Sequence, residues 1–370
     1  MTADRRSRDP ANAPADGAPV WVLAGHRAGD RGQVLALARA LGIAYEIRQL
    51  RFNPLHVLPN VVQGARLSSL ARGSRPGIAP PWPKLVIGSG RRSVPVARWI
   101  REQSGGRTRL VQVGRPRAPL HLFDLVVTTP QYGLPDRPNV EHLLLPIQEP
   151  QARIAPQEQA LWADAIAALP QPRIAVLAGG GSPPFRFGAS EAADLGRRVS
   201  RLAERHGGSL LVTTSPRTGA AATAALRKAV SAPALVHVWE PGGSNPYQVF
   251  LDAADAIVVT GDSISMLAEA CRTGRPVMIA EPRASAAATA LLAAGASFDR
   301  LWGRLADAGL LARPRDIRRV LDAVVDEGLA HWFREDRSIP PAGESRRLGR
   351  DMARVVARVR ALVETPSQAG

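Results

Sequence analysis

The chain has 370 residues, of which 45% are hydrophobic and 22% charged, so it can build the cores of about two domains. This composition excludes global disorder and a coiled coil, and the single cysteine, Cys271, excludes both an internal disulfide framework and a cysteine-rich zinc site. The net charge of +16 attracts phosphates and anionic lipids, but scattered arginines and only 5% aromatic residues argue against nucleic acid as a partner.

The N-terminal residues do not resemble a secretory signal. Residues 1–19 are polar and lack an apolar segment, which predicts a disordered tail. No apolar run elsewhere approaches the ~20 residues that cross a bilayer. Nearly all of the 48 basic residues are arginine, and alanine, glycine and proline abound, which indicates a GC-rich bacterial genome. We therefore expect a bacterial, cytoplasmic protein whose charge also suits peripheral binding at the inner face of the membrane.

The first domain, residues 20–150, alternates short apolar runs with segments of helical spacing. This alternation predicts βα units on a parallel sheet. The predicted strands are Val20–Ala24, Tyr45–Leu50, Leu85–Gly88, Leu110–Val113, Leu125–Thr128 and His142–Leu145. The predicted helices are Gly32–Leu41, Pro54–Ala71 and Val94–Gln103. Four prolines between Gly73 and Lys84 predict an irregular loop.

The second domain, residues 173–340, repeats this design after a proline-rich linker, residues 151–172, which has a short helical pattern at Glu158–Leu169. The predicted strands are Ile174–Ala178, Leu210–Thr214, Leu235–Trp239, Ala256–Thr260 and Val277–Ala280. The predicted helices are Ala189–Arg205, Gly219–Ser231, Ser263–Arg272, Ala286–Ala294 and Arg315–Asp326.

The C-terminal segment, residues 341–370, contains an arginine-rich helix at Glu344–Val363. Its apolar residues recur at spacings of three and four and form one stripe, which needs a surface to cover. A return of this helix to the first domain satisfies that need. The fold class is therefore α/β: two Rossmann-like domains facing a cleft, as in the GT-B glycosyltransferases, with a returning C-terminal helix.

The most specific motif follows the predicted strand Ala256–Thr260. Gly261 permits a tight turn and Asp262 or Ser263 can cap the next helix, whose free amides form an anion site. Hydroxyls of Ser263 and Ser265 can add hydrogen bonds to phosphate, and Glu269 can accept from ribose. Met266 belongs to the same run. The alternative is a simple helix cap with a solvated Glu269.

Three further turns of the second domain follow predicted strands. In Gly179-Gly180-Gly181-Ser182 the missing side chains let a backbone approach a phosphate. In Thr214-Ser215-Pro216-Arg217-Thr218 the guanidinium can pair with phosphate. In Asn245-Pro246-Tyr247 the amide can contact a base or sugar. Each can also be an ordinary turn, but parallel strands bring all of them to one sheet edge, where ligands bind in open α/β sheets.

Two loops of the first domain hold candidates for the acceptor side. The loop after Val20–Ala24 contains Gly25, His26, Arg27, Asp30 and Gln33. His26 can act as a general base on an acceptor hydroxyl, and Asp30 can orient it or cap the helix. The alternative is a capping loop with a solvated histidine.

The turn Ser89-Gly90-Arg91 repeats this pattern after Leu85–Gly88 and can contact an anion. The seven histidines are dispersed and no HxxH, HExxH or DxD pattern occurs, so we expect no metal and no cofactor. Cys271 lies among apolar neighbours and is predicted to be a core residue.

Several of these runs together resemble the mitochondrial fission ELM family (elongated mitochondria protein), over about Val20 to Val363. They are Gly25 to Gln33, Ser89 to Arg91, Gly179 to Gly181, Thr213 to Thr218, Asn245 to Tyr247, and Thr260 to Met266 with Glu269. The resemblance implies a GT-B-like fold. Bacterial members are often labelled nucleoside-diphosphate-sugar epimerases, and the plant name comes from recruitment of a dynamin-type protein to the outer mitochondrial membrane.

The leading hypothesis is a protein that binds a nucleotide-diphosphate sugar on its second domain and transfers the sugar, without a metal, to an acceptor that the sequence does not identify. The alternative is a non-catalytic, membrane-associated interaction protein with the same fold. A two-domain phosphosugar epimerase is a third option, but the chain has neither a Tyr-x-x-x-Lys pair nor an NAD fingerprint.

Overall fold

The computed structural model describes residues 19–25, 28–149, 154–182, 185–284, 315–344 and 346–364. The chain divides into two units, each built around one six-stranded sheet. Unit 1 comprises residues 1–150, 295–316 and 349–370, and unit 2 comprises residues 151–294 and 317–348. The predicted α/β class with two Rossmann-like units is confirmed.

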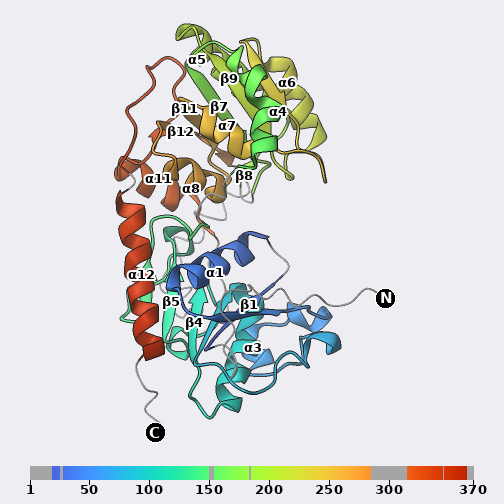
Figure 1. Cartoon of the computed structure of the whole chain (residues 1–370), viewed down its shortest axis with the longest axis vertical. Coiled ribbons are helices and arrows are strands. Elements are labelled where there is room, and N and C mark those ends of the chain that lie inside the picture. Colours follow the sequence, from blue (N-terminus) through green and yellow to red (C-terminus); the bar gives the residue numbers. More distant parts are fainter. Residues whose placement is uncertain are drawn as a thin grey trace. The chain divides into compact units, whose positions relative to one another are not determined.

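The sheet of unit 1 is entirely parallel and has the order β2-β1-β3-β4-β5-β6. Figure 1 labels β1, β4 and β5 of this sheet. Its strands are β1 Val20–Ala24, β2 Tyr45–Gln49, β3 Leu85–Ser89, β4 Arg109–Val113, β5 Leu125–Thr128 and β6 Val140–His142. Side chains alternate between its faces, as a strand requires: Val20 and Val22 join one core cluster, and Trp21 and Leu23 join the other.

Helices cover both faces of this sheet. Helix α1, Ala28–Leu41, packs with Val20 and Val22 on one face. Helix α3, Gly90–Gln103, packs on the other face through Val94, Ala97 and Ile100. Both faces are therefore buried, which explains the continuous apolar runs of the central strands.

The C-terminal helix α12, Arg346–Glu364, returns to unit 1 as the apolar stripe predicts (Figure 1). Val355 and Val359 are fully buried in the core cluster that contains α1. Glu141 of β6 accepts hydrogen bonds from two arginines of the helix, Arg354 and Arg358. Burial would raise the pKa of Glu141, but these two bonds lower it below its usual range.

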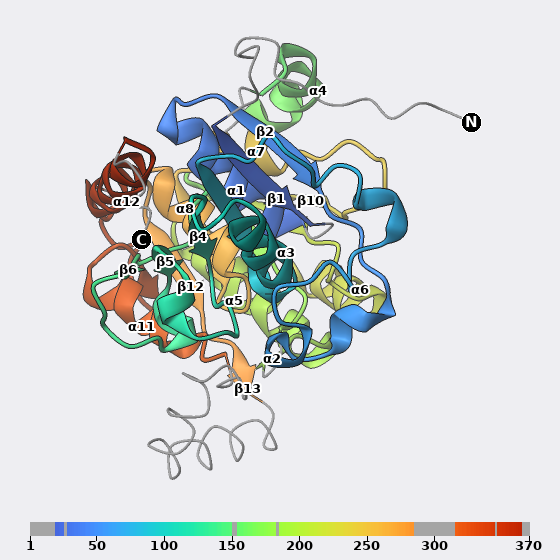
Figure 2. The ribbon, with the colours of Figure 1, turned by 90° about the horizontal axis from the view of Figure 1, so that it is seen from below.

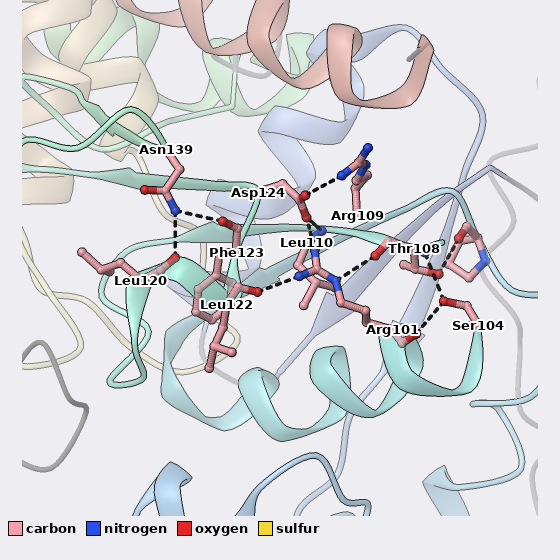
Figure 3. A network of polar contacts seen from close by, with 11 residues as sticks. Arg101, Ser104, Thr108, Arg109, Leu110, Leu120, Leu122, Phe123, Asp124 and Asn139 are labelled. Atoms are coloured by element: carbon pink, nitrogen blue, oxygen red, sulfur yellow. Dashed lines mark hydrogen bonds and ion pairs between the residues drawn. The ribbon is translucent and has the colours of Figure 1, made fainter. Parts of the chain in front are cut away.

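A buried polar network holds α3 to β4 and β5 (Figure 3). Arg101 donates to the carbonyl oxygens of Thr108, 3.1 Å, and Leu122, 2.9 Å, and pairs with the carboxylate of Asp124. Asp124 also accepts from the backbone amide of Leu110 at 2.6 Å. Burial lowers the pKa of Arg101 although Asp124 opposes this effect. These contacts are within unit 1 and serve its packing.

The predicted helix Pro54–Ala71 is wrong. The segment instead forms a 3-10 turn, η1 Pro54–Val57, and a single helical turn, α2 Asn60–Gln63, and Leu70 then pairs with Phe52 in a β-bridge. Pro59 stops the first turn, and Gly64 adopts a positive φ of 59° that ends the second. The last strand also lies earlier than predicted, because residues 140–142 rather than 142–145 pair with β5.

The sheet of unit 2 is likewise parallel, with the order β10-β9-β7-β11-β12-β14. Its strands are β7 Arg173–Ala178, β9 Ser209–Thr214, β10 Ala234–His237, β11 Ala256–Thr260, β12 Val277–Ala280 and β14 His331–Trp332. Its helices are α4 Pro156–Ala167, α5 Ala189–Arg205, α6 Ala220–Ala229, α7 Tyr247–Ala253, α8 Ile264–Arg272 and α11 Arg318–Asp326. A separate two-stranded sheet pairs β8, Phe185–Arg186, with β13, Arg283–Ala284.

Several elements depart from the predicted boundaries. Helix α4 lies within the predicted linker and packs on unit 2, where Ile166 joins Phe250 of α7. Arg315 and Asp316 belong to unit 1 and both bond to Gln131. Helix α7, β14 and the β8–β13 pair are absent from the predicted elements. The predicted tail, residues 1–19, and the predicted helix Ala286–Ala294 lie outside the described residues except for Pro19.

Glu335 follows β14 and holds that segment to α5. Its carboxylate accepts hydrogen bonds from Arg198, 2.7 Å, and Arg201, 2.8 Å. Burial would raise the pKa of Glu335, but the arginines outweigh it and lower the pKa to about 2. Because the folded-state pKa lies below the ordinary value of 4.5, this stabilisation is complete above pH 4.5 and is lost as the pH falls toward 2.

We expect Glu335→Gln to lower the free energy of unfolding at neutral pH by about 1 kcal/mol, since the pair is partly solvated. Its stability should fall less steeply than that of the unsubstituted protein as the pH drops from 4.5 to 2. Denaturant titrations at several pH values measure both effects. Glu344→Gln, at an exposed residue paired with Arg346, is the matched control. Equal pH slopes for the Glu335→Gln and unsubstituted proteins would contradict the assignment.

Candidate functional site

The candidate site lies where the strand order of unit 2 reverses. Strands β9 and β10 follow β7 on one side, and β11 and β12 continue on the other. The loops after β7 and β11 therefore diverge, and a doubly wound sheet binds ligands at this edge. These are the loops that carry Gly179 to Ser182 and Gly261 to Ser263.

The two loops bond directly to each other. The amide of Gly179 donates to Thr260 Oγ1 at 2.7 Å, and the amide of Gly180 donates to Asp262 Oδ2 at 3.2 Å. Both amides thus have protein acceptors. The glycines expected to present amides to a phosphate instead hold the two strand ends together.

Gly179 and Gly180 must be glycine because atoms of the neighbouring loops lie where a side chain would be. A Cβ on Gly179 would lie 2.3 Å from Asp262 Oδ1, and one on Gly180 would lie 1.9 Å from the carbonyl carbon of Arg217. Gly181 has a φ of +71°, which side chains rarely adopt. Contacts with the loops after β11 and β9 therefore explain Gly179 and Gly180, and the positive φ explains Gly181.

The turn after β9 packs against the glycines. Thr218 Oγ1 accepts from the amide of Ser215, 3.0 Å, and donates to the carbonyl of Gly179, 2.5 Å. Thr214 Oγ1 accepts from the amide of Trp239 at 2.9 Å and so joins the ends of β9 and β10. The hydroxyls predicted as ligand contacts therefore also build the turn.

Asp262 is buried, with 3% of its surface exposed, and only one of its oxygens has a hydrogen-bond partner. Oδ1 has no partner among the described residues. The guanidinium of Arg217, half exposed, lies 3.7 Å from Oδ2. A buried carboxylate oxygen without a donor is costly, so this oxygen is poised to accept from a hydroxyl or a water molecule.

Helix α8 begins directly after this carboxylate. Ser263 is its N-cap residue but makes no side-chain cap bond. The amide of Leu267 is the first to bond within the helix, to the carbonyl of Ser263, so the amides of Ile264, Ser265 and Met266 lack intrahelical partners. Ser265 is exposed and Met266 half-buried. These amides provide a positive helix end at the switch point.

The loop after β10 places its three predicted residues differently. Asn245 is exposed and its Oδ1 accepts from the amide of Tyr247 at 3.2 Å, while Pro246 is a buried N-cap of α7. The side chain of Tyr247 interacts with Glu269, which lies about two turns beyond Asp262 along α8. Burial, followed by the Glu269 charge, raises the pKa of Tyr247 well above its ordinary value, and burial raises the pKa of Glu269.

A second switch point occurs in unit 1, between β1 and β3, and here too the structure brings predicted residues together. Gly90 has a φ of +65°, and a Cβ on it would lie 3.3 Å from Asp30 Oδ2. Gln33 bonds back to the carbonyl of Gly29 within α1. Gly25 begins the loop after β1 and is half-buried. His26 and Arg27 lie outside the described residues.

The turn Ser89-Gly90-Arg91 is held by two residues that the sequence prediction did not assign to the site. Gln112 Nε2 donates to the carbonyl of Gly90 at 3.0 Å, and Ser93 Oγ donates to that of Ser89 at 3.0 Å. Gln112 is buried in β4, whose other buried residues are all apolar. A polar residue in such a strand, like Thr260 in β11, is the sequence signal that identifies these supporting residues.

Two of the cavities that the described residues line belong to unit 2. One of about 50 Å³ lies beside Thr260 and Asp262, with Arg198 and Arg283 in its wall; it can hold a few water molecules but not a nucleotide. A larger one, about 380 Å³, lies beside β14 and is lined by His331, Trp332, Arg334 and other residues outside the predicted loops.

Three further observations limit the chemistry of the described residues. They contain no group of three or more His, Cys, Asp or Glu side chains placed to hold a metal ion. Cys271 is buried, as predicted for a core residue, and burial raises the pKa of its thiol to about 12. Among the described helices, none combines the length and apolar composition of a membrane span.

Known structures with similar chain architecture include a UDP complex, an epimerase and a glycosyltransferase. The UDP complex of MnaA from S. aureus is 13% identical, covers 95% of this chain and 99% of its own, and has a TM-score of 0.46. The UDP-GlcNAc 2-epimerase of Methanocaldococcus jannaschii is 12% identical. The match covers 92% of this chain and 99% of the epimerase chain, with a TM-score of 0.47. A glycosyltransferase of Rickettsia africae is 10% identical. The match covers 94% of this chain and 98% of the glycosyltransferase chain, with a TM-score of 0.45. Likeness at this level concerns the fold alone.

Two relatives are similar in sequence. The mitochondrial fission protein ELM1 of Arabidopsis thaliana is 29% identical over 219 residues, which are 53% of this chain and 51% of that protein. The chain thus spans about half the length of this relative. The uncharacterized protein RP120 of Rickettsia prowazekii is 24% identical over 71% of this chain and 83% of its own. The sequence model of the family described as mitochondrial fission ELM1 matches residues 28–313, well over half of the 370 residues, and the chain therefore belongs to that family.

Proposed function

We propose that unit 2 binds a nucleotide-diphosphate sugar at the carboxyl ends of β7 and β11 and that the protein transfers the sugar to an acceptor without a metal. The observation that carries this proposal is the buried Asp262 oxygen without a partner, next to the open amides of α8. A helix end that attracts phosphate and a carboxylate that accepts a hydroxyl together suit a phosphorylated sugar.

The helix end and the Asp262 carboxylate would bind different parts of the ligand. The amides of Ile264 to Met266 and the hydroxyl of Ser265 would bind the diphosphate, with Arg217 as a charge-assisted donor. The carboxylate of Asp262 repels phosphate, so its free oxygen would accept from a sugar or ribose hydroxyl instead. Glu269 lies deeper along α8 beside Tyr247 and would act on the ribose only if that contact opened.

Transfer breaks the bond between the anomeric carbon and the diphosphate oxygen, which leaves with the electron pair. The acceptor hydroxyl oxygen bonds to the same carbon and gives its proton to a base. In unit 1, Asp30 beside Gly90 is a candidate for that base, and His26 remains a sequence prediction. Positive charge at the α8 terminus and on Arg217 would stabilise the leaving diphosphate in place of a metal.

We expect nucleoside diphosphates to raise the unfolding temperature. A ligand at 100 times its dissociation constant adds about 2.7 kcal/mol to the free energy of unfolding. Arg217→Gln should weaken binding about tenfold, because a charged hydrogen bond is lost. Thermal shift titrations with UDP, GDP and ADP measure this. Arg227→Gln, at an exposed residue of α6, is the control and should leave the affinity unchanged.

The same titration tests the helix end through the double variant Ser263→Ala and Ser265→Ala, which should also bind more weakly. Unchanged affinity of this variant would count heavily against the assignment. Release of free nucleoside diphosphate from a panel of nucleotide sugars, with a chelator present, tests transfer itself. Binding without turnover of any nucleotide sugar would favour the alternative of a non-catalytic interaction protein, and interconversion of one nucleotide sugar into another would favour an epimerase.

A further inference from the structure

One stretch of unit 1 carries positive charge only. Between Glu46 and Glu102 the sequence contains ten arginine or lysine residues and no aspartate or glutamate. In a chain with 32 acidic residues, a run of this length without any of them creates a local field much stronger than the average charge implies. The segment that lacks the predicted helix lies within this stretch.

The same segment carries most of the exposed large apolar side chains. Six such side chains occur among the described residues, and all but Leu161 lie between positions 55 and 62. They are Leu55, Val57, Leu58, Val61 and Val62, and between 39% and 65% of each is exposed. We call these five residues the apolar patch. It includes residues of η1 and α2; α2 is labelled in Figure 2.

The fold keeps the apolar patch exposed, because two polar residues of the segment, Asn60 and Gln63, are buried instead. Asn60 is buried and donates to the carbonyl oxygens of Arg91, 2.9 Å, and Pro116, 3.0 Å. Gln63 is buried and donates to the carbonyl of Leu58 at 2.7 Å. The guanidinium of Arg91 donates to the same carbonyl at 3.1 Å. These bonds hold the backbone so that the valines and leucines face outward, the reverse of a soluble helical turn.

Arginines surround the patch in sequence and remain available. Arg51, Arg66 and Arg72 are exposed, and the structure shows no acidic partner for their side chains among the described residues. In contrast, the arginines of α12 are largely engaged, since Arg354 and Arg358 pair with Glu141 and Arg360 donates to the carbonyl of Leu41. Exposed arginines without an acidic partner among the described residues therefore flank the apolar patch in the sequence on both sides.

We propose that the apolar patch docks on an anionic lipid bilayer. Its valines and leucines would enter the boundary between headgroups and acyl chains, and Arg51, Arg66 and Arg72 would contact lipid phosphates. The apolar side chains, whose charged neighbours in the sequence are all basic, match a bilayer that is apolar inside and carries negative charge at its surface. The docking does not depend on the proposed binding of a nucleotide sugar in unit 2.

Sedimentation with vesicles tests the apolar contribution. The full chain should pellet with vesicles of phosphatidylglycerol and phosphatidylcholine and much less with phosphatidylcholine alone. The double variant Val57→Asp and Val62→Asp should bind at least about tenfold more weakly, because it removes two buried apolar contacts and adds repulsion. Leu161→Asp, at an equally exposed leucine of α4 in unit 2, should bind as the unsubstituted protein does.

The charge contribution needs its own pair of variants. Arg66→Gln with Arg72→Gln should lose about fivefold in affinity for each arginine, and added salt should weaken the unsubstituted protein similarly. Arg205→Gln with Arg227→Gln removes the same charge from exposed residues of unit 2 and should lose little. The unfolding temperature of each variant, compared with that of the unsubstituted protein, separates a folding defect from a docking defect.

Two outcomes would overturn the proposal. One is a protein that does not pellet with anionic vesicles, or that pellets equally well after Val57→Asp and Val62→Asp. The other is self-association that depends on the patch, measured by analytical ultracentrifugation, without any vesicle binding. The second result would assign the patch to an interface between copies of this chain.

Discussion

Gly180→Ala should lower the free energy of unfolding of unit 2 by about 3 kcal/mol, and the unfolding temperature by roughly 6–12 °C for a unit of this size. The added methyl group would lie 1.9 Å from the carbonyl carbon of Arg217 and 2.4 Å from the amide nitrogen of Thr218. Both atoms belong to the backbone, so no side-chain rotation relieves the overlap. The loop after β7 or the turn after β9 must move.

Calorimetry of the variant measures this effect, and Gly219→Ala is its matched control. Gly219 lies two residues beyond Arg217, and a Cβ there would meet nothing within 4 Å. The control should lose only a few tenths of a kcal/mol. If nucleotides bind where we propose, Gly180→Ala should also lose nucleotide affinity, because Arg217 and Asp262 shift together. Equal stability of the two alanine variants would show that the contact between the loops is not important.

Val355→Asp should detach α12 from unit 1 and cost about 4 kcal/mol or more. Val355 is fully buried in the cluster that holds β1, β3 and α1, so a carboxylate there would be buried without a partner. We expect a lower unfolding temperature and faster proteolysis of the C-terminal segment.

Ala357→Asp is the matched control, because Ala357 is exposed two residues further along the same helix. It introduces the same charge at a cost of less than about 1 kcal/mol. Limited proteolysis followed by mass spectrometry identifies which segment is released. A variant Val355→Asp that resists proteases as well as Ala357→Asp would refute the packing of α12 on unit 1.

The two switch points have a shared construction. At each, the loops that follow two neighbouring strands carry glycine on one side and a carboxylate on the other: Gly179 with Asp262 in unit 2, and Gly90 with Asp30 in unit 1. A buried polar residue of a neighbouring strand, Thr260 or Gln112, holds the glycine loop by a hydrogen bond. Rigid loops of this kind preserve the geometry of a binding site while no ligand is bound.

The location of the apolar patch relates to this construction. Arg91 follows Gly90 at the switch point of unit 1 and donates to the carbonyl of Leu58 within the patch. The loop that we associate with an acceptor and the surface that we associate with lipid are thus continuous within one unit. Proteins that modify molecules at a membrane surface require such an arrangement, and the vesicle experiment tests the surface independently of the reaction.

Most regular elements could be predicted from sequence because their signals are local. The apolar runs Val20–Ala24, Leu125–Thr128, Ala256–Thr260 and Val277–Ala280 are strands with the predicted bounds, and Ala189–Arg205 is a helix with the predicted bounds. The stripe on the last helix indicated correctly that it covers a domain. Periodicity reports which side chains must be buried, and burial is what selects these elements.

The segment from Pro54 to Gln63 shows where local signals fail. Its leucines and valines have helical spacing, but Asn60 and Gln63 find acceptors that include Arg91 and Pro116, far along the chain. Those bonds stabilise two short turns instead of one helix. Propensity is a weak term, and hydrogen bonds of buried side chains outweigh it.

By itself, the sequence determined the two parallel α/β units, the turns that follow their strands and the residue types in those turns. Only the tertiary structure decided what the turns do: Gly179 and Gly180 use their amides on Thr260 and Asp262, and Asp262 retains one buried oxygen without a partner. The reason is that a turn forms from neighbouring residues, whereas the hydrogen-bond partner of each buried group depends on which strand lies beside it in the sheet.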